Sequence, residues 1–587
     1  MSEEGLAAAR QKMPEAGVDP VAIEVFTSYY HQLETGDTGL IREDTIFPLT
    51  DPPMLDDVEV SEEQAAEALD KTVIIKLNGG LGTSMGLDRA KSLLEVRDGK
   101  SFLDIIATQV LSARKAFGAR LPLMFMNSFN TREDTLKALE KYPDLAVDGL
   151  ELDFLQDQEP KLDAETLAPV EWPKDSSLEW CPPGHGDLYT ALLGSGVLDH
   201  LLEAGYQYAS VSNGDNLGAV PDGRLAGWFA ASGAPYAAEL CRRTINDKKG
   251  GHLAIRKSDD QLILRDTAQT AEEEMDYFTD EHRHPFFHTN NLWFDLEALK
   301  KVLDERHGVM GLHIIRNEKT VDPKDSSSTP VIQIESAMGG AIEVFEGATC
   351  ICVDRSRFLP VKTTNELLLL RSDVYDLDDS DHLVKTTDMT CAVDLDKDFY
   401  KKIGDFDDRI PEPPSLRRAT SLKVKGDWTF GSEVVVAGTF RWILRSLRRF
   451  RTEPCSLAKP RREKVTPDQQ CWEAVAAVLT GQRLTAPDNP GWQAVDVVEW
   501  LAEEGWPANR LANRRAEFQQ AGRSWPGPIP DDLSPGLEFA RYGAVLAQAR
   551  RIAGLDGLTA TVHRGAVVIG PDEARLLAER PPHSLLH

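Results

Sequence analysis

The sequence predicts an α/β protein whose core is a parallel sheet covered by helices on both faces. Three short apolar runs, within TVIIKLNGG, LPLMFMNS and YQYASVSNGDN, each end in glycine or small polar residues. A helical stretch, SFLDIIATQVLSARKAF, lies between the first two runs. Alternation of strand, loop and helix is typical of such sheets, and ligands bind at the carboxyl ends of their strands. We therefore expect the three polar tips to lie together.

The chain is too long for one compact core, because 587 residues exceed the size at which single cores stop growing. Residues 1–70 are expected to be mostly helical, with a proline-rich break at FPLTDPPM. The alternating pattern fills residues 71–410. Residues 411–440 begin with a proline-marked linker and continue as short strands with glycine turns. Residues 441–587 are expected to form a separate, mainly helical module.

Residues 441–587 differ in composition from the rest of the chain. They hold six of the eleven tryptophans, and arginine almost replaces lysine. The net charge is roughly +3 here and roughly −33 over the first 440 residues. Two interpretations are open: an appended domain, whose Trp and Arg are typical of protein-binding surfaces, or a GC-rich gene read in a shifted frame. The regular helical pattern of residues 468–555 favours the appended domain.

The overall composition excludes several classes of protein. A net charge of −30 argues against nucleic acid as a main partner, although local lysines and backbone N–H groups can still bind phosphates. The chain has no apolar run of about 18 residues, so no membrane span is expected. The seven cysteines are scattered and form no CxxC pair, which predicts neither a zinc site nor a disulfide framework. A reducing, cytoplasmic setting is expected.

A glycine-rich turn directly follows the first predicted strand. It reads LNGGLGTSMG, from Leu77 to Gly86, and glycine lets successive N–H groups approach phosphate oxygens. The spacing matches neither a Walker A loop nor a dinucleotide-binding GxGxxG motif. Taken alone, the turn is as readily structural as phosphate-binding. Lys91 follows five residues later, and its nearness to the turn favours a phosphate ligand over an ordinary surface charge.

Three further positions carry candidate chemistry. Asp215, in the NGDN turn that ends a strand, is suited to Mg²⁺, which prefers carboxylate and phosphate oxygens; a plain Asn-Gly turn is the alternative. His185 lies between two glycines, where it either contacts a ligand or caps a turn. Lys362 follows a strand-like run and a proline, and Thr363 and Thr364 look like the cap of the next helix.

Six motifs, in order, closely resemble the UDP-glucose pyrophosphorylase family in its eukaryotic form. They are LNGGLGTSMG, KSLLEVRDGKSFLD, PPGHGDLYTAL, SNGDNLGA, HTNNLWFDLEAL and FLPVKTTNELL. The likeness extends from about residue 20 to about residue 440. It implies a Rossmann-like nucleotidyltransferase core with a mixed or mostly parallel sheet, followed by a left-handed β-helix that begins near VKGDWTFGSEVVVAGTF. Residues 441–587 lie outside the resemblance.

The resemblance also implies a role for each matching residue. Nucleotide binding falls to Leu77, Asn78, Gly79, Gly80, Gln156, Gly184 and Asn213. Binding of the sugar phosphate falls to His185, Gly251 and Asn291. Lys91 would contact the triphosphate, Lys362 would bridge the phosphates of the two substrates, and Asp215 would hold Mg²⁺. Before Lys91 the chain reads LDRA where the family has a cysteine and Gly-Pro, so the rigidity of that loop does not carry over.

The implied reaction is uridylyl transfer from UTP to glucose 1-phosphate, giving UDP-glucose and pyrophosphate. Ser84 favours glucose, since relatives that act on N-acetylhexosamine phosphates carry an arginine there. Galactose 1-phosphate and N-acetylglucosamine 1-phosphate stay open as alternative substrates. A catalytically silent nucleotide-sugar sensor is also open, although the joint presence of Lys91, Asp215 and Lys362 argues against it. The C-terminal module could serve self-association or a protein partner.

Overall fold

The structure is a computed structural model that divides into two compact units, Met1–Leu447 and Arg448–His587. Each unit is described by itself. The described residues are 2–36, 39–244, 247, 250–443, 467–486, 494–520, 539–553, 560–563 and 566–569. The arginine-dense stretch that follows residue 443, with Cys455, lies outside them.

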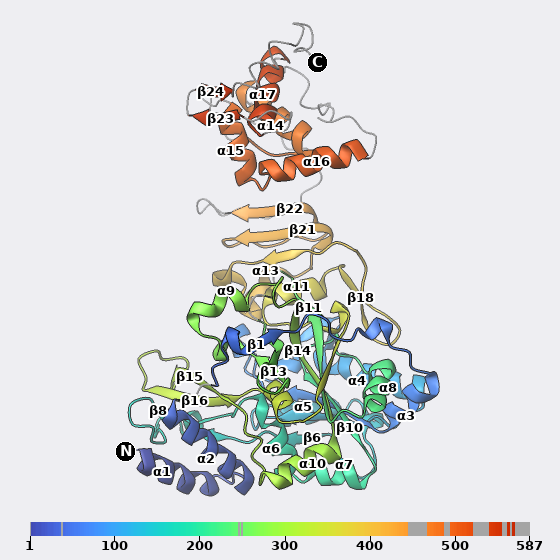
Figure 1. The fold of residues 1–587 in the computed structure, drawn as a ribbon, viewed down its shortest axis with the longest axis vertical. Coiled ribbons are helices and arrows are strands. Elements are labelled where there is room, and N and C mark those ends of the chain that lie inside the picture. The colour runs from blue at the N-terminus through green and yellow to red at the C-terminus, as the bar shows by residue number, and fades with distance from the viewer. Residues whose placement is uncertain are drawn as a thin grey trace. The chain divides into compact units, whose positions relative to one another are not determined.

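A seven-stranded mixed sheet forms the centre of the first unit (Figure 1). Its order is β17-β11-β14-β10-β2-β5-β6, and every pair is parallel except those that β14 makes with β10 and β11. The strands are β2 (Thr72–Asn78), β5 (Leu123–Asn127), β6 (Asp153–Leu155), β10 (Tyr208–Asn213), β11 (Tyr236–Arg242), β14 (Phe286–Asp295) and β17 (Thr349–Cys352). The three predicted strands are therefore confirmed as β2, β5 and β10.

The direction of β14 follows from the excursion that precedes it. After β11 ends, the chain leaves the sheet and returns to the same edge, where the Arg243 N–H donates to Pro285 O at 2.7 Å. The next strand must run back from that edge, so it pairs antiparallel to β11. Its sequence, FFHTNNLWFD, carries no signal of direction.

Helices cover both faces of the sheet because successive β2 side chains point to opposite sides. Val73 and Ile75 pack in one core cluster, and Ile74 packs in the other. The first cluster is completed by α1 (Ser2–Glu15), α2 (Pro20–Thr35), α6 (Leu188–Gly194), α7 (Val197–Glu203) and α10 (Leu296–Glu305). The second is completed by α3 (Glu62–Asp70), α4 (Phe102–Phe117), α5 (Arg132–Leu139), α8 (Gly223–Ser232), α11 (Thr364–Arg371), α12 (Lys397–Tyr400) and α13 (Ile403–Arg409).

Smaller sheets surround this core. Two have three strands: β1 (Ile46–Pro48), β12 (His252–Arg256) and β13 (Leu262–Arg265); and β15 (Ile314–Thr320), β16 (Pro330–Ser336) and β8 (Leu162–Asp163). Three have two strands: β3 (Glu95–Arg97) with β4 (Lys100–Ser101), β7 (Glu159–Pro160) with β9 (Trp180–Cys181), and β18 (Tyr375–Leu377) with β19 (Leu383–Lys385). A short helix, α9 (Met275–Phe278), precedes β14. The N-terminal 70 residues thus hold α1, α2, α3 and β1.

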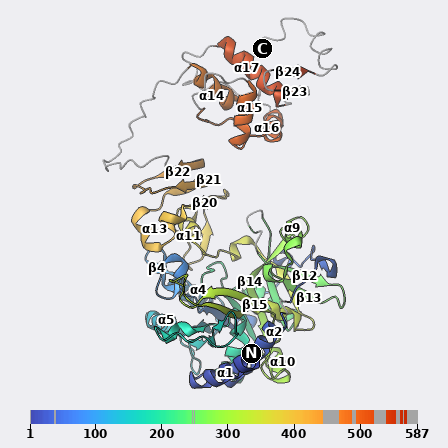
Figure 2. The same ribbon diagram turned by 90° about the vertical axis from the view of Figure 1, so that its left-hand side faces the viewer.

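Stacked parallel strands end the first unit (Figure 2). They are β20 (Ala392–Asp394), β21 (Ser415–Lys425) and β22 (Val435–Ile443). Short strands were expected here, but β21 has 11 residues and β22 has 9. β21 pairs with β22 from Ser415 to Lys425, with two register shifts, and with β20 only from Ser421 to Lys423.

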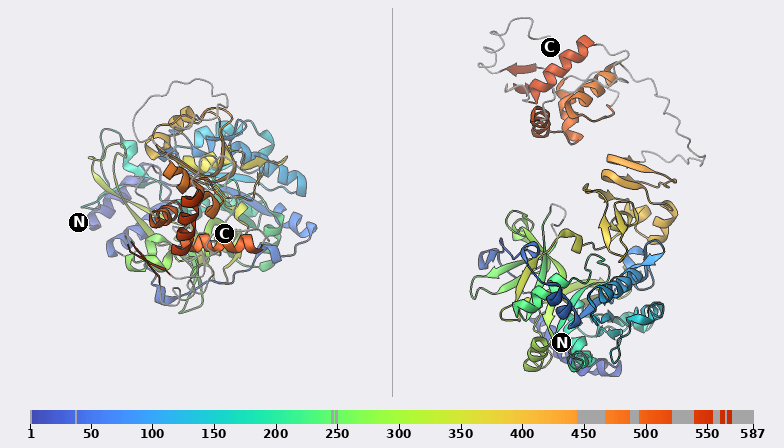
Figure 3. Two further views of the ribbon diagram at one scale, coloured as in Figure 1. Left: turned by 90° about the horizontal axis from the view of Figure 1, so that it is seen from above. Right: turned by 90° about the vertical axis from the view of Figure 1, so that its right-hand side faces the viewer.

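Helices predominate among the described residues of the second unit, where they pack against one another (Figure 3). They are α14 (Pro467–Thr480), α15 (Ala494–Glu503), α16 (Ala508–Gln520) and α17 (Phe539–Ile552), with the hairpin β23 (Ala560–His563) and β24 (Ala566–Ile569). Trp472, Trp500 and Trp506 lie in their shared core. In the described ranges of both units, no helix has the length and hydropathy that a membrane crossing requires.

Candidate active site

A pocket of about 280 Å³ opens at the carboxyl ends of the central strands. β2, β5 and β10 end side by side there, with Asn78 opposite Asn127 and Leu77 opposite Asn213 in the strand registers. The Asn78 side chain donates to Asn127 Oδ1 at 2.7 Å. The expectation that the polar tips lie together is confirmed.

Most of the residues that the sequence predicted for the site line this pocket. Its walls include Leu77, Asn78, Gly79, Gly80, Lys91, Gln156, Gly184, His185, Asn213 and Asp215. They also include four residues that sequence reasoning missed, namely Ser92, Met126, Pro182 and Gly214. Three predicted residues lie outside this wall: Lys362, Gly251 and Asn291.

Glycines at one end of the pocket are required by close packing. A Cβ on Gly79 would come within 2.3 Å of Gln156 Oε1. Gly184 has φ of +82°, and a Cβ there would lie 2.6 Å from Ser336 O. Gln156 Nε2 donates to Gly184 O at 2.8 Å, which ties the two walls together. Only glycine combines this conformation with this proximity.

The LDRA loop before Lys91 is closed by its own contacts. Leu81 and Ala90 form an antiparallel bridge across its base. The Leu87 N–H donates to Gly82 O at 3.0 Å, and the Leu87 side chain is buried over Gly82. Local packing thus holds Lys91 beside the glycine turn, and the Lys91 N–H donates to Gly80 O at 3.3 Å.

Lys91 and Asp215 form an ion pair inside the pocket. Lys91 Nζ donates to Asp215 Oδ2 at 2.6 Å and also to Val361 O. Their side chains retain 19% and 21% of their exposure, so both stay accessible to a ligand. A partly buried lysine beside a carboxylate and a glycine turn can attract phosphate while the carboxylate attracts a cation.

His185 is half-buried at the other side of the pocket. The Met338 N–H donates to His185 Nδ1 at 3.0 Å, so the neutral ring carries its proton on Nε2. Burial lowers the pKa of His185 to about 4, so the ring is uncharged near neutral pH. His185 can therefore donate a hydrogen bond to an anionic oxygen but supplies no positive charge.

Lys362 lies on the segment that also supplies Val361 O to Lys91. Its side chain is exposed, and the helix α11 begins just after it. Thr363 caps that helix, with its side chain accepting from Asn365 N at 3.2 Å, and Thr364 is the first helical residue. The predicted cap is confirmed. The cap fixes the backbone that carries Lys362.

Gly251 and Asn291 do not line the pocket, and each is held by contacts of its own. A Cβ on Gly251 would lie 2.0 Å from Asp266 Oδ1, and its carbonyl accepts from His288 N at 2.8 Å. Both amide atoms of Asn291 are engaged inside the protein, where the side chain donates to Glu239 and accepts from Asn216. Its neighbour Asn290 is half-buried, and Asn290 Nδ2 donates to Asn213 Oδ1 at 3.0 Å.

A pair of carboxyl groups, half-buried Asp157 and buried Asp187, adjoins Gln156 and was not foreseen. The Asp157 N–H donates to Asp187 Oδ2 at 2.7 Å. Burial, together with Asp19, raises the pKa of Asp157 to about 7, and burial with Asp157 raises the pKa of Asp187 well above its usual value. Asp187 follows His185 by two residues, but its type alone gave no sign of burial.

Replacement Asp157→Asn is expected to weaken the pH dependence of stability. The pKa of Asp157 is about 7 in the folded chain, above the ordinary aspartate value, so the unfolded state binds fewer protons between about pH 4 and pH 7. The free energy of unfolding of the native chain therefore falls as pH rises through this window. The variant has no charge to bury. Its free energy of unfolding, compared with that of the native chain, is expected to be about 1–2 kcal/mol higher at pH 8 than at pH 5. Urea unfolding at both values checks this.

The exposed residue Asp148 supplies the control, and Asp148→Asn is expected to leave the pH slope unchanged. If the free energy of unfolding changed equally with pH in the native chain and in Asp157→Asn, the titration would not belong to this pair.

Comparisons with known sequences agree with the geometry. The family model described as UTP--glucose-1-phosphate uridylyltransferase matches residues 23–437. A curated protein of that name from Solanum tuberosum is 38% identical over 407 residues, covering 68% of this chain and 81% of its own length. Another from Saccharomyces cerevisiae is 38% identical over 375 residues, covering 63% and 73%.

Solved structures give the same result. A structure described as UDP-glucose phosphorylase from Trypanosoma brucei has a TM-score of 0.70 at 42% identity, covering 76% of this chain and 98% of that chain. A mutant of UDP-glucose pyrophosphorylase from Leishmania major, in complex with UDP-glucose, has a TM-score of 0.70 at 41% identity, covering 75% and 96%. With its fold, its pocket and these matches taken together, the chain belongs to the UTP–glucose-1-phosphate uridylyltransferase family.

Proposed function

We propose that this chain transfers the uridylyl group of UTP to glucose 1-phosphate in the pocket at the ends of β2 and β10. The products are UDP-glucose and pyrophosphate. The observation that carries this proposal is the Lys91–Asp215 pair, 2.6 Å apart, facing a glycine turn at a sheet edge. A cation, a carboxylate and a glycine-rich backbone in one pocket suit a nucleoside triphosphate.

The chemical step is an in-line displacement at phosphorus. A phosphate oxygen of glucose 1-phosphate attacks the α-phosphorus of UTP. The bond from that phosphorus to the oxygen shared with the β-phosphate breaks, and pyrophosphate leaves with the electron pair. The protein contributes positioning and charge stabilisation, so Lys91 and Lys362 are assigned to oxygens on which charge builds.

The residues around the glycine turn are assigned to binding the nucleotide. Gly79, Gly80 and the ends of β2 bring backbone groups close to the ligand, since no side chain intervenes. Leu77, Asn78 and Asn213 belong to the same wall. Gln156 and Gly184, joined by their 2.8 Å hydrogen bond, are assigned to the base. A fixed amide can read the edge of uracil because its donor and acceptor are held in place.

The sugar phosphate is assigned to the side of the pocket that holds His185. The neutral ring would donate from Nε2 to a phosphate oxygen. Gly251 and the Asn290–Asn291 pair are assigned to the sugar hydroxyls, and Asn290 is the half-buried member of that pair. His288 links the two groups, because its backbone N–H donates to Gly251 O, and burial, with His185 nearby, lowers the pKa of its ring to about 4.

Mg²⁺ is proposed as the cofactor, held by Asp215. Among the described residues, no cluster of three or more His, Cys, Asp or Glu could hold a metal alone. A single carboxylate fits Mg²⁺, which keeps waters and takes its other ligands from substrate phosphates. When bound there it would neutralise phosphate charge. Lys91 would then share Asp215 with the ion.

Two proposals concern the rest of the chain. The parallel stack of β20, β21 and β22 supports the start of a β-helix, whose left-handed form follows the resemblance. The second unit, with its own tryptophan-rich core, is proposed to serve self-association or a protein partner. A reducing, cytoplasmic compartment is also proposed, supported by the six described cysteines, which are buried and not joined in disulfides.

Pyrophosphate release from the purified full chain tests the function. The assay supplies Mg²⁺, UTP and glucose 1-phosphate, with other nucleotides, galactose 1-phosphate and N-acetylglucosamine 1-phosphate as comparisons. Selective turnover with UTP and glucose 1-phosphate is expected, and turnover by residues 1–447 alone would assign it to the first unit. Binding of UDP-glucose without turnover, in folded protein, would favour the nucleotide-sugar sensor instead.

A further inference from the structure

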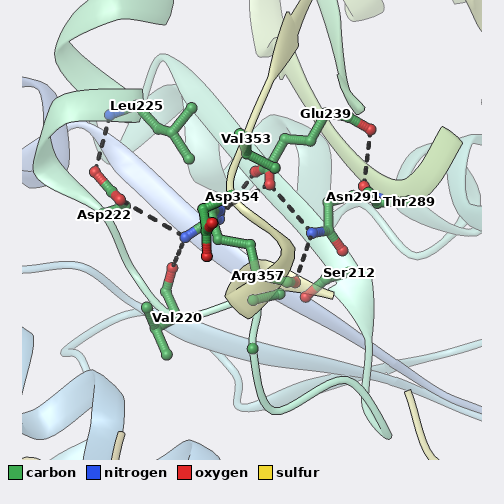
Figure 4. Close-up of polar contacts among 12 residues, drawn as sticks. Ser212, Val220, Asp222, Leu225, Glu239, Thr289, Asn291, Val353, Asp354 and Arg357 are labelled. Atoms are coloured by element: carbon green, nitrogen blue, oxygen red, sulfur yellow. Dashed lines mark hydrogen bonds and ion pairs between the residues drawn. The ribbon is translucent and has the colours of Figure 1, made fainter. Parts of the chain in front are cut away.

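A buried ion pair lies beneath the two segments that carry Asp215 and Lys362. Arg357 donates from Nε to Glu239 Oε2 and from Nη2 to Glu239 Oε1, both at 2.9 Å (Figure 4). Their side chains are 7% and 1% exposed. Burying two charges is costly, and apolar residues of similar size often serve stability as well. Stability alone therefore does not explain a buried ion pair at this place.

A chain of hydrogen bonds leads from this pair to the Asp215 turn. Glu239 Oε2 accepts from Asn291 Nδ2 at 3.1 Å, and Glu239 Oε1 accepts from Trp293 Nε1 at 2.9 Å. Asn291 Oδ1 then accepts from Asn216 Nδ2 at 3.2 Å. Because the carboxylate can only accept, it fixes which way the Asn291 amide faces.

Asn216 joins the Asp215 turn to the Lys362 segment. Its Nδ2 also donates to Arg357 O at 3.1 Å, and its Oδ1 accepts from Leu359 N at 2.8 Å and from Gly218 N at 3.2 Å. The backbones meet as well, since Asn216 and Pro360 form a bridge. All polar atoms of this buried side chain are occupied by groups of the two segments or by Asn291.

Hydrogen bonds from Lys76 and Arg357 hold the chain before and after the Asp215 turn. Lys76 Nζ, fully buried, donates to Ser212 Oγ and to Ala219 O, each at 2.7 Å. Arg357 Nη1 donates to Val220 O at 3.0 Å. The residues on both sides of Asp215 are therefore tied to groups that lie below the pocket and do not line it.

We propose that Asn216 and Arg357 are positioning residues that fix the Asp215 turn and the Lys362 segment at one separation. This rests on the proposed function of Asp215 and Lys362. Asn216 does not line the pocket, so it acts through its neighbours. Catalysis by positioning is sensitive to small displacements, and a shift of about 1 Å can cost about 100-fold in rate.

Asn216→Asp tests the proposal with little change in shape. The new carboxylate keeps the acceptor for Leu359 and Gly218 but turns a lone pair toward Asn291 Oδ1 and Arg357 O. Asn291 cannot reverse its amide without facing Glu239 with its own oxygen. We expect kcat to fall about 30-fold while KM for UTP and glucose 1-phosphate changes by less than about threefold. A kcat within about twofold of the native value would overturn the proposal.

Lys161→Met is the matched control for loss of buried polar contacts. Lys161 is buried, and its Nζ donates to Val321 O at 3.0 Å in a satellite cluster. The variant is expected to change the melting temperature but leave kcat and KM unchanged. If it lowered kcat as much as Asn216→Asp, the effect would be one of general stability and the proposal would fail.

A double-mutant cycle separates positioning from an independent defect. In an Asp215→Asn background, Asn216→Asp is expected to lower kcat by clearly less than about 30-fold, because one of the two groups that it positions is already lost and only Lys362 is still displaced. The same 30-fold loss in both backgrounds would overturn the proposal.

Hydrogen exchange gives a readout without turnover. In Asn216→Ala, amides of residues 356–363 are expected to exchange faster, and in Lys161→Met they are not. Unchanged exchange in Asn216→Ala would overturn the proposal that Asn216 holds the two segments together. Absence of turnover in the native chain would instead count against the proposed function, and the exchange result would still decide whether Asn216 joins the two segments.

Discussion

Lys91→Ala is expected to lower kcat about 100- to 1,000-fold. Lys91 is the cation on the pocket wall that faces the glycine turn, where the triphosphate is proposed to lie. The substitution also leaves the partly buried carboxylate of Asp215 without its 2.6 Å partner. Phosphate would then approach a carboxylate that has lost its ion-pair partner. Steady-state pyrophosphate release measures the loss.

Lys100→Ala is the matched control for this prediction. Lys100 also pairs with an aspartate at 2.6 Å, Asp381, but it lies in β4 and does not line the pocket. Its loss is expected to leave kcat within about twofold of the native value. Comparable activity of Lys91→Ala and Lys100→Ala would remove Lys91 from the mechanism.

The sequence predicted the centre of the site because local signals coincide there. β2, β5 and β10 are short apolar runs, and each ends in residues that suit a sheet edge. The glycine turn and the NGDN turn directly follow two of them. Since parallel strands end at one edge, Lys91 and Asp215 come together although 124 residues separate them.

What the sequence could not predict depends on contacts across long separations. Glu239 lies within an apolar strand, YAAELCR, and its partner Arg357 follows 118 residues later in a short 3-10 helix, Arg355–Arg357. Neither position differs from a surface charge until the fold buries both. The same applies to Asp157 and Asp187, whose raised pKa values arise from burial. Asn291 was assigned to the sugar from its motif, but the motif did not reveal that its amide faces Glu239.

Lys362→Ala is expected to lower kcat about 100-fold without loss of stability. Lys362 is exposed, so the substitution opens no cavity, and the Thr363 cap still fixes the start of α11. Its effect should therefore arise only when both substrates are bound and their phosphates need a shared cation. kcat should fall more than the affinity for UTP, since the bridging contact strengthens as charge builds on the phosphate oxygens. Kinetics over both substrate concentrations, with a thermal melt, measure the two effects separately.

Lys401→Ala provides the comparison, because Lys401 is an exposed lysine in the same unit that does not line the pocket. It removes the same charge from the chain, so a general electrostatic effect on anionic substrates would lower both variants alike. A kcat for Lys362→Ala within about twofold of the native value would exclude Lys362 from phosphate bridging. A selective loss in Lys362→Ala, with unchanged melting, would identify a group that acts on the transition state and contributes nothing to folding. Such a group is free to move toward the substrates, whereas Lys91 is already held by Asp215 and Val361 O before they bind.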